Sequence, residues 1–558
     1  MLGLLALAGL LSVQPARAAD SPVAAYLSGR IAEGAGDWSL AADQLHAALA
    51  ADPDNAGLVR RTFLLTLGEG RYDRALALAG RLETLESGSF LADTLLIADA
   101  LRSGRTGEAA SRLPDLPTDG LGQFASPLLA AWVHAADGRT DAALAALAPL
   151  DRAQGFQPLK AVQAGLILDL AGRTEEAAAQ YQAAVVAGGP LRLIQLVGNF
   201  LERQGRGAEA RALYLAQAGN DRGDADSLLT DAIDRLDRGE APAPLVRTAA
   251  DGLGEAMFDL SMALNQQDAA EMALLYGRVA LMLAPDKPLA RLMMGDVLAA
   301  RDRHGAALAE YRSVQGPPAA AWTARLREAE SLRQLDRGQE AATLLAAMAA
   351  ERPDRADALI RLGDMERMAA RFDGAIGAYD QALARLSAAG RDDWILRYVR
   401  AMALHAADRW PEAEADLRRA LDLNPDHPSV LNYLGYTWVD RGERLDEGLA
   451  LIERAVARRP RDGHIIDSLG WALFKKGDVT AAITHLERAA ELEPLDPTIN
   501  DHLGDVYWAA GRRAEARFQW ARAARQATED PKLRAAVEEK LRNGLPLPKT
   551  AGLPAGQE

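Results

Sequence analysis

Apolar residues, above all alanine, fill the stretches between regularly spaced glycines and aspartates, and charged residues are scattered among them. Alanine favours helix because it loses no side-chain entropy on folding and lets neighbouring helices approach closely. No run of alternating β-branched residues is long enough to predict a sheet. The hydrophobic pattern therefore predicts an all-α chain.

A turn residue, usually Gly or Asp, recurs at a nearly constant interval and marks the link between two helices of a repeated unit. Most intervals are 34 residues, and the exceptions are 33, 29, 38 and 35. The fifteen turn positions are Gly36, Gly70, Gly104, Gly138, Gly172, Gly205, Gly239, Asp268, Asp302, Asp336, Ala370, Asp408, Gly442, Gly477 and Gly511. This regularity predicts a repeat array, in which each unit buries its apolar face against its neighbours.

Small residues and a proline recur at fixed distances from these turn residues. We call the first helix of each repeated unit helix A and the second helix B. An Ala five positions after the turn is expected where helix B crosses helix A, because only a methyl group fits there. A Gly seven positions before the turn permits close packing inside the unit. The alanines are Ala41, Ala75, Ala109, Ala143, Ala177, Ala210, Ala307, Ala341, Ala375, Ala413, Ala482 and Ala516. The glycines are Gly29, Gly295, Gly363, Gly435, Gly470 and Gly504, and the terminal prolines are Pro53, Pro285, Pro353, Pro425, Pro460 and Pro494.

Together these positions resemble the tetratricopeptide (TPR) repeat family over nearly the whole chain after residue 18. The resemblance implies a solenoid of helical hairpins, wound as a right-handed superhelix of about fifteen repeats. It also implies a scaffold that holds other proteins rather than an enzyme.

The two ends of the chain are expected to differ from the repeats. Residues 1–18 are interpreted as a secretory signal peptide, since the apolar run 2–13 is too short to span a bilayer. The run leads to the small-x-small cleavage pattern Ala16-Arg17-Ala18, although no Lys or Arg precedes it, and a buried first helix is the alternative. Residues 527–543 are expected to hold a capping helix that shields the last apolar face, and residues 544–558 a disordered tail.

A break in the rhythm divides the repeats into an N-terminal array, residues 19–220, and a C-terminal array, residues 255–526. Between them, residues 221–254 are degenerate, because Pro242 and Pro244 stand where a helix B would begin. The next interval shortens to 29 residues. We interpret this segment as a junction and a candidate hinge.

The amino-acid composition limits the classes of partner and the cellular compartment that fit this chain. The net charge of −15 argues against nucleic acid and anionic membrane as partners. The chain has no cysteine, which excludes disulfides, thiolate metal sites and a lipidated cysteine anchor. With the secretory start, this predicts a periplasmic protein, and peripheral association with the outer membrane is the second option.

No catalytic motif accompanies the repeats. The sequence lacks HExxH, a P-loop, GxSxG and a dinucleotide-binding glycine pattern, so we expect no catalytic, cofactor-binding or metal-binding residues. The eight histidines are scattered, and none pairs with another at metal-binding spacing within one helix.

The concave face of the last three full repeats, residues 428–526, is the predicted protein-binding groove. Counting each helix A from Pro428, Gly463 and Pro497 assigns Leu434, Leu469 and Leu503 to the packing face. The groove positions are Asn432, Tyr433, Tyr436, Asp467, Trp471, Asp501, His502, Asp505 and Trp508. This aromatic and acidic surface suits a segment with basic and apolar side chains. The alternative for Trp508, Asp467 and Asp501 is packing or hydrogen bonding within the stack.

Three six-residue motifs in this region show a more specific resemblance: LNYLGY at 431–436, IDSLGW at 466–471 and NDHLGD at 500–505. They are similar to proteobacterial envelope TPR lipoproteins that act as adaptors for periplasmic carboxy-terminal-processing proteases. The resemblance implies two protein partners, the protease and clients such as cell-wall hydrolases. The absent cysteine departs from that pattern. The alternative function is a structural subunit of an envelope assembly or export complex, for example in polysaccharide export or cytochrome maturation.

Overall fold

The computed structural model describes residues 21–85, 89–152, 155–185, 189–220 and 225–545. Within these ranges the chain is helical and contains no β-strand, as the sequence predicts. The predicted signal peptide lies outside the described residues, and so does all but the first two residues of the predicted tail. The chain divides into two units, residues 1–341 and residues 342–558, and each is described by itself.

The helices of the first unit are paired along the chain. They are α1 (Pro22–Gly34), α2 (Trp38–Ala48), α3 (Ala56–Gly68), α4 (Tyr72–Leu85), α5 (Phe90–Arg102), α6 (Thr106–Ser111), α7 (Gly122–Ala136), α8 (Thr140–Ala146), α9 (Gln157–Leu170), α10 (Thr174–Ala184), α11 (Leu191–Arg203), α12 (Gly207–Asn220), α13 (Ala225–Asp237), α14 (Ala249–Gln266), α15 (Ala270–Leu283), α16 (Pro288–Ala299), α17 (His304–Arg312) and α18 (Pro318–Gln334). Helix α19 (Gly338–Glu351) crosses the division between the units.

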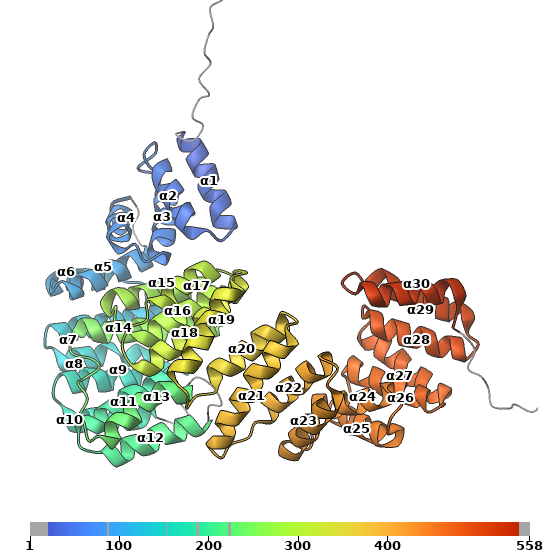
Figure 1. The fold of residues 1–558 in the computed structure, drawn as a ribbon. Coiled ribbons are helices and arrows are strands. Elements are labelled where there is room, and N and C mark those ends of the chain that lie inside the picture. The colour runs from blue at the N-terminus through green and yellow to red at the C-terminus, as the bar shows by residue number, and fades with distance from the viewer. Residues whose placement is uncertain (1–20, 86–88, 153–154, 186–188, 221–224, 546–558) are drawn as a thin grey trace, which may run out of the picture. The chain divides into compact units, whose positions relative to one another are not determined.

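The second unit continues the same alternation (Figure 1). Its helices are α20 (Asp357–Met368), α21 (Phe372–Ala388), α22 (Trp394–Ala406), α23 (Trp410–Leu423), α24 (Pro428–Asp440), α25 (Leu445–Arg458), α26 (Gly463–Lys475), α27 (Val479–Leu492), α28 (Pro497–Ala509), α29 (Arg513–Gln526) and α30 (Pro531–Asn543). None of the described helices is long and apolar enough to cross a membrane.

The predicted turns are confirmed at the level of the backbone. All fifteen turn residues have a positive φ, from 55° at Ala370 to 90° at Gly477. Glycine adopts this left-handed conformation without a steric penalty, and aspartate tolerates it better than most residues. The repeated turn residue is therefore a requirement of chain geometry.

The predicted helix crossings are confirmed as well. The twelve repeated alanines are all fully buried, with 0% of each side chain exposed. The glycine of helix A is equally constrained, because a Cβ on Gly504 would lie 2.4 Å from Cδ1 of Trp520 in the paired helix. At Gly295, a Cβ would lie 2.2 Å from Cε1 of Tyr311. Small residues thus set how closely the two helices of a repeat approach.

The degenerate segment 221–254 contains α13 and then a stretch without helix. No helix B follows Gly239, and residues 240–248 lead directly into α14. Asn199 fixes this stretch by donating a hydrogen bond of 2.9 Å from Nδ2 to the carbonyl oxygen of Ala243. Thr248 then caps α14 by accepting from the amide of Asp251. The missing helix accounts for the short interval of 29 residues, and the segment lies within the first unit.

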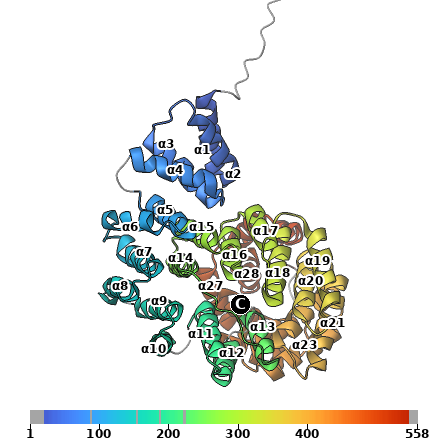
Figure 2. The same cartoon turned by 90° about the vertical axis from the view of Figure 1, so that its left-hand side faces the viewer.

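Helices α14 and α15 pack back onto earlier repeats of the first unit. Helix α14 contacts α5, α7 and α9, and α15 contacts α3 and α5, as Figure 2 shows. At Gly252 of α14 the indole of Trp132 comes so close that a Cβ would lie 2.1 Å from its Cη2 atom. Arg278 of α15 donates a 2.8 Å hydrogen bond from Nε to the carbonyl oxygen of Gly68. The first unit is therefore held by contacts between residues about 200 positions apart.

We predict that a larger side chain at a helix crossing destabilises the fold, whereas the same change on the exposed side of the helix does not. Ala413→Leu is expected to lower the free energy of unfolding by about 1–3 kcal/mol, because the buried crossing has no room for three more carbons. Ala415→Leu on the exposed side of α23 is the matched control. Urea unfolding of the full chain, followed by circular dichroism, measures both. Equal midpoints would contradict the crossing constraint.

Candidate protein-binding surface of the C-terminal repeats

The three A helices of the predicted groove begin at the residues expected from the sequence, namely Pro428, Gly463 and Pro497. Asp462 and Asp496 cap the second and third helices by accepting hydrogen bonds from the amides of Ile465 and Ile499. The predicted packing residues Leu434, Leu469 and Leu503 are all buried. The opposite positions of these helices therefore form the candidate surface.

Two of the nine groove residues, Asp467 and His502, form a buried ion pair. Nδ1 of His502 lies 3.0 Å from both carboxylate oxygens of Asp467. Burial alone would lower the pKa of His502, but the carboxylates of Asp467, Asp501 and Asp505 together outweigh it, and the pKa lies above its ordinary value. The indole of Trp471 stacks on the imidazole with ring centroids 4.1 Å apart. These contacts join α26 to α28.

Asp501 and Asp505 are paired with a residue of the capping helix. Nζ of Lys540 in α30 lies 2.8 Å from both oxygens of Asp501 and 2.8 Å from Oδ2 of Asp505. Trp520 donates a further hydrogen bond of 2.9 Å from Nε1 to Asp505. Burial and the neighbouring Asp501 carboxylate raise the pKa of Asp505. Both carboxylates therefore serve to hold α30 against α28.

Trp508 lies beneath the chain segment that follows α30. Its Nε1 donates a hydrogen bond of 3.0 Å to the carbonyl oxygen of Leu545. A Cβ on Gly544 would lie 2.0 Å from Cζ2 of the indole, and the Arg513 guanidinium lies 3.8 Å from the ring centroid. This end of the groove is occupied by the C-terminal part of the same chain.

The expectation of an open acidic groove needs correction. Its three aspartates are buried, and each is paired within the chain: Asp467 with His502, and both Asp501 and Asp505 with Lys540. The sequence gave no sign that α30 places its lysine beside these aspartates. A basic partner finds no unpaired carboxylate among these three positions.

The aromatic members of the groove remain accessible in part. Tyr433, Tyr436 and Trp471 are half-buried, and so is Tyr398 on the preceding helix α22. We call these four residues the aromatic row. The rings of Tyr398 and Tyr433 meet edge to face at 5.9 Å, and the Tyr433 hydroxyl lies 2.9 Å from Nδ1 of His405. Burial raises the pKa of Tyr433 to about 12, so its hydroxyl keeps its proton at neutral pH.

Sequence reasoning missed Tyr398, although a signal for it was present. Tyr398 lies ten residues before its turn residue Asp408, as Asn432, Asp467 and Asp501 lie ten residues before theirs. Extending the count by one repeat would have included it. Asn432 is half-buried beside the row.

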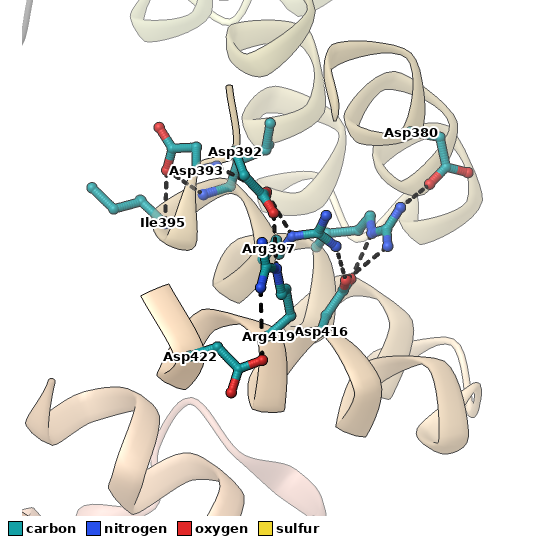
Figure 3. Close-up of polar contacts among 10 residues, drawn as sticks. Asp380, Asp392, Asp393, Ile395, Arg397, Asp416, Arg419 and Asp422 are labelled. Carbon is teal, nitrogen blue, oxygen red and sulfur yellow. Dashed lines mark hydrogen bonds and ion pairs between the residues drawn. The ribbon is translucent and has the colours of Figure 1, made fainter. Parts of the chain in front are cut away.

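A cluster of arginine–aspartate pairs connects α22 to its neighbouring helices (Figure 3). Arg397 lies 2.7 Å from Asp392 and 3.0 Å from Asp416, and Arg400 pairs with Asp380 and Asp416 at 2.6 Å. Asp416 is 2% exposed, so two arginines neutralise a buried carboxylate. The cluster fixes the helix that carries Tyr398. Among the described residues, no group of His, Asp or Glu is arranged to hold a metal ion.

Three segments of the chain match a known repeat family. A family model described as a tetratricopeptide repeat matches residues 326–393, 398–463 and 468–531. These segments are tetratricopeptide repeats. With the helical pairs described above, they confirm the predicted all-α TPR solenoid. Such repeats generally form protein-interaction scaffolds, which confirms the coarser part of the functional prediction.

A TPR repeat-containing protein of Pseudomonas aeruginosa is 33% identical over 199 residues. The match covers 36% of this chain and 33% of that protein, so the chain spans about a third of the curated relative's length. The crystal structure of the APC/C hetero-tetramer Cut9–Hcn1 is 15% identical, with a TM-score of 0.37 over 95% of this chain and 97% of that one. A tetratricopeptide repeat protein from Parabacteroides merdae is 14% identical, with a TM-score of 0.37 over 46% of this chain and 97% of that one.

We predict that the His502–Asp467 pair makes stability depend on pH. Because the folded pKa of His502 is raised, the pair stabilises the fold fully below the unfolded pKa and loses this effect as pH rises through the folded pKa. The difference in melting temperature between the native chain and His502→Gln should therefore be larger at about pH 6 than at about pH 9. His46→Gln, at an exposed histidine of helix α2, is the control. A pH-independent difference would contradict the ion pair.

Proposed function

We propose that this chain is a periplasmic adaptor that binds a client protein on the aromatic row and brings it to a protease. The observation that carries the binding proposal is the row itself, which runs across α22, α24 and α26 and remains half-exposed. Tyr and Trp provide large contact areas at low entropic cost and dominate the energy of many protein interfaces. A TPR scaffold with such a row is suited to hold a polypeptide segment.

The contacts of the row indicate the kind of segment that fits. The aspartates beside it are paired within the chain, and Nζ of Lys475 lies 5.0 Å from the Trp471 ring centroid. An apolar or aromatic segment therefore gains more from this surface than a strongly basic one. Tyr hydroxyls at the edge of the row offer hydrogen bonds to the backbone of an extended or helical segment.

The compartment and the protease connection rest on the sequence. The apolar run at 2–13 and the motif Ala16-Arg17-Ala18 support export to the periplasm. The three six-residue motifs support a relationship to adaptors of carboxy-terminal-processing proteases. The relative in Pseudomonas aeruginosa is consistent with a proteobacterial family.

The proposal predicts a position-dependent cross-link in living cells. A photo-crosslinking amino acid at Tyr436 should capture a periplasmic client, because this position lies in the aromatic row. The same amino acid at Phe518, which is 61% exposed on helix α29, is the matched control and should capture little. Equal capture at both positions, or capture of cytoplasmic proteins alone, would contradict the proposal.

Loss of the gene separates the adaptor from the alternative function. An adaptor for a protease predicts that its captured clients, such as cell-wall hydrolases, accumulate in the periplasm of the deletion strain. A structural subunit of an export or assembly complex predicts stoichiometric copurification with a membrane complex and no accumulation of clients. The second result would reject the connection to a protease. Client binding at the aromatic row would still be tested by the cross-link at Tyr436.

A further inference from the structure

A cavity of about 610 Å³ lies in the first unit, where α14 packs back onto the earlier repeats. Helices α9, α11, α14 and α16 supply most of its wall, and Figure 2 shows these helices. Packing defects in protein interiors seldom exceed the volume of a few water molecules. Pockets that bind small organic ligands typically measure about 300–1,000 Å³. The volume of this cavity is therefore that of a ligand site.

The wall is mainly apolar. Phe156 and Leu159 contribute from α9 and the residue before it, Leu196 from α11, and Phe258 and Met262 from α14. Phe258 and Leu196 are buried, whereas Met262 is half-buried. Asn265, Gln266 and Gln267, at the end of α14, line the same cavity and are exposed to solvent. The cavity thus combines an apolar interior with a polar rim.

Asp259 of α14 is a carboxylate in this apolar wall. It accepts a hydrogen bond of 2.9 Å from Nε2 of Gln163, which in turn accepts one of 2.8 Å from the buried indole of Trp132. Among the described residues, no Lys, Arg or His forms an ion pair with Asp259. Its position is fixed by neutral groups, and its charge is left without a direct counter-ion.

The cations closest to Asp259 belong to another carboxylate. Glu255, one turn earlier on α14, pairs with Arg192 of α11 and with Lys287, whose Nζ lies 3.0 Å from Oε1. These two cations lower the pKa of the buried Glu255 to about 2. Burial, together with the Glu255 charge, raises the pKa of Asp259 to about 7. Besides Asp259, the wall carries three charged residues, Arg192, Asp296 and Arg327. Arg192 is paired with Glu255, and Arg327 lies 2.8 Å from Asp296, so both wall cations already have a carboxylate partner.

We propose that this cavity binds a small amphiphilic amine, with its apolar body among the aromatic and aliphatic side chains and its ammonium group on Asp259. The apolar wall accounts for the body of the ligand, because burial of apolar surface drives its transfer from water. The carboxylate accounts for the ammonium group, because a carboxylate set in an apolar wall is stabilised by a hydrogen-bonded partner of opposite sign. An anionic ligand would be repelled by Asp259 and would find Arg192 and Arg327 already paired, and a neutral ligand would leave Asp259 without a counter-ion. This site lies in the first unit and does not depend on the function proposed for the aromatic row.

Three ligands that share an eight-carbon chain and differ in their head group test whether the site prefers an amine. The full-length protein is titrated calorimetrically with octylamine, 1-octanol and octanoate at about pH 8. Octylamine is expected to bind most tightly, and Asp259→Asn should weaken its binding about tenfold or more, since a hydrogen bond between charged groups is lost. Asp119→Asn, which removes the same charge from an exposed loop position, should leave the affinity unchanged. Equal affinity for the three probes, or full affinity in Asp259→Asn, would overturn the assignment.

A pH series and a filled cavity provide independent readouts. Octylamine affinity should rise about tenfold between pH 6 and pH 8 as Asp259 loses its proton, and this rise should vanish in Asp259→Asn. Met262→Trp, which fills the cavity from α14, should weaken the binding of octylamine and octanol alike. Both variants are checked by their helical circular dichroism. Unchanged binding in a folded Met262→Trp would place the probes elsewhere and reject the site.

Discussion

The two helices of a repeat cross closely, and both the turns and the surfaces of the array follow from that crossing. Twelve fully buried alanines and the glycines that oppose helix B bring the two axes together, and a left-handed turn residue reverses the chain between them. Because most repeats meet the same requirement, successive hairpins present their A helices in a common register. The spacing of the aromatic row and of the ion pairs between successive A helices follows from this register.

The polar groups of the A helices show how the array uses that register. Charges that face one another across adjacent helices become ion pairs, such as His502 with Asp467 and Arg397 with Asp416. After the last described helix pair, Lys540 of α30 pairs with Asp501 and Asp505 of α28, where the A helix of a further repeat would otherwise pack. In the first unit, α14 turns back onto earlier helices and creates both a buried charge network and a cavity. Where a repeat lacks a regular neighbour, the chain therefore supplies a substitute.

The sequence predicted the local geometry well because that geometry recurs with a fixed period. Turn residues, crossing alanines and the first residues of α24, α26 and α28 could all be read from spacing. The return of α14 onto α5, α7 and α9 could not, since no period connects residues so far apart in the chain. The pairing of Lys540 with Asp501 was hidden for the same reason. Of the candidate site, the first residues of its A helices were predictable, whereas the pairing of its aspartates and the presence of Tyr398 were not.

We propose that a client protein binds the A helices of the second unit through the aromatic row. Hydrogen exchange of the full chain, alone and saturated with the client captured at Tyr436, measures this directly. Binding is expected to slow exchange in α22, α24 and α26 and to leave the B helices α27 and α29 unchanged. Protection confined to α27 and α29, or spread evenly over the second unit, would contradict it.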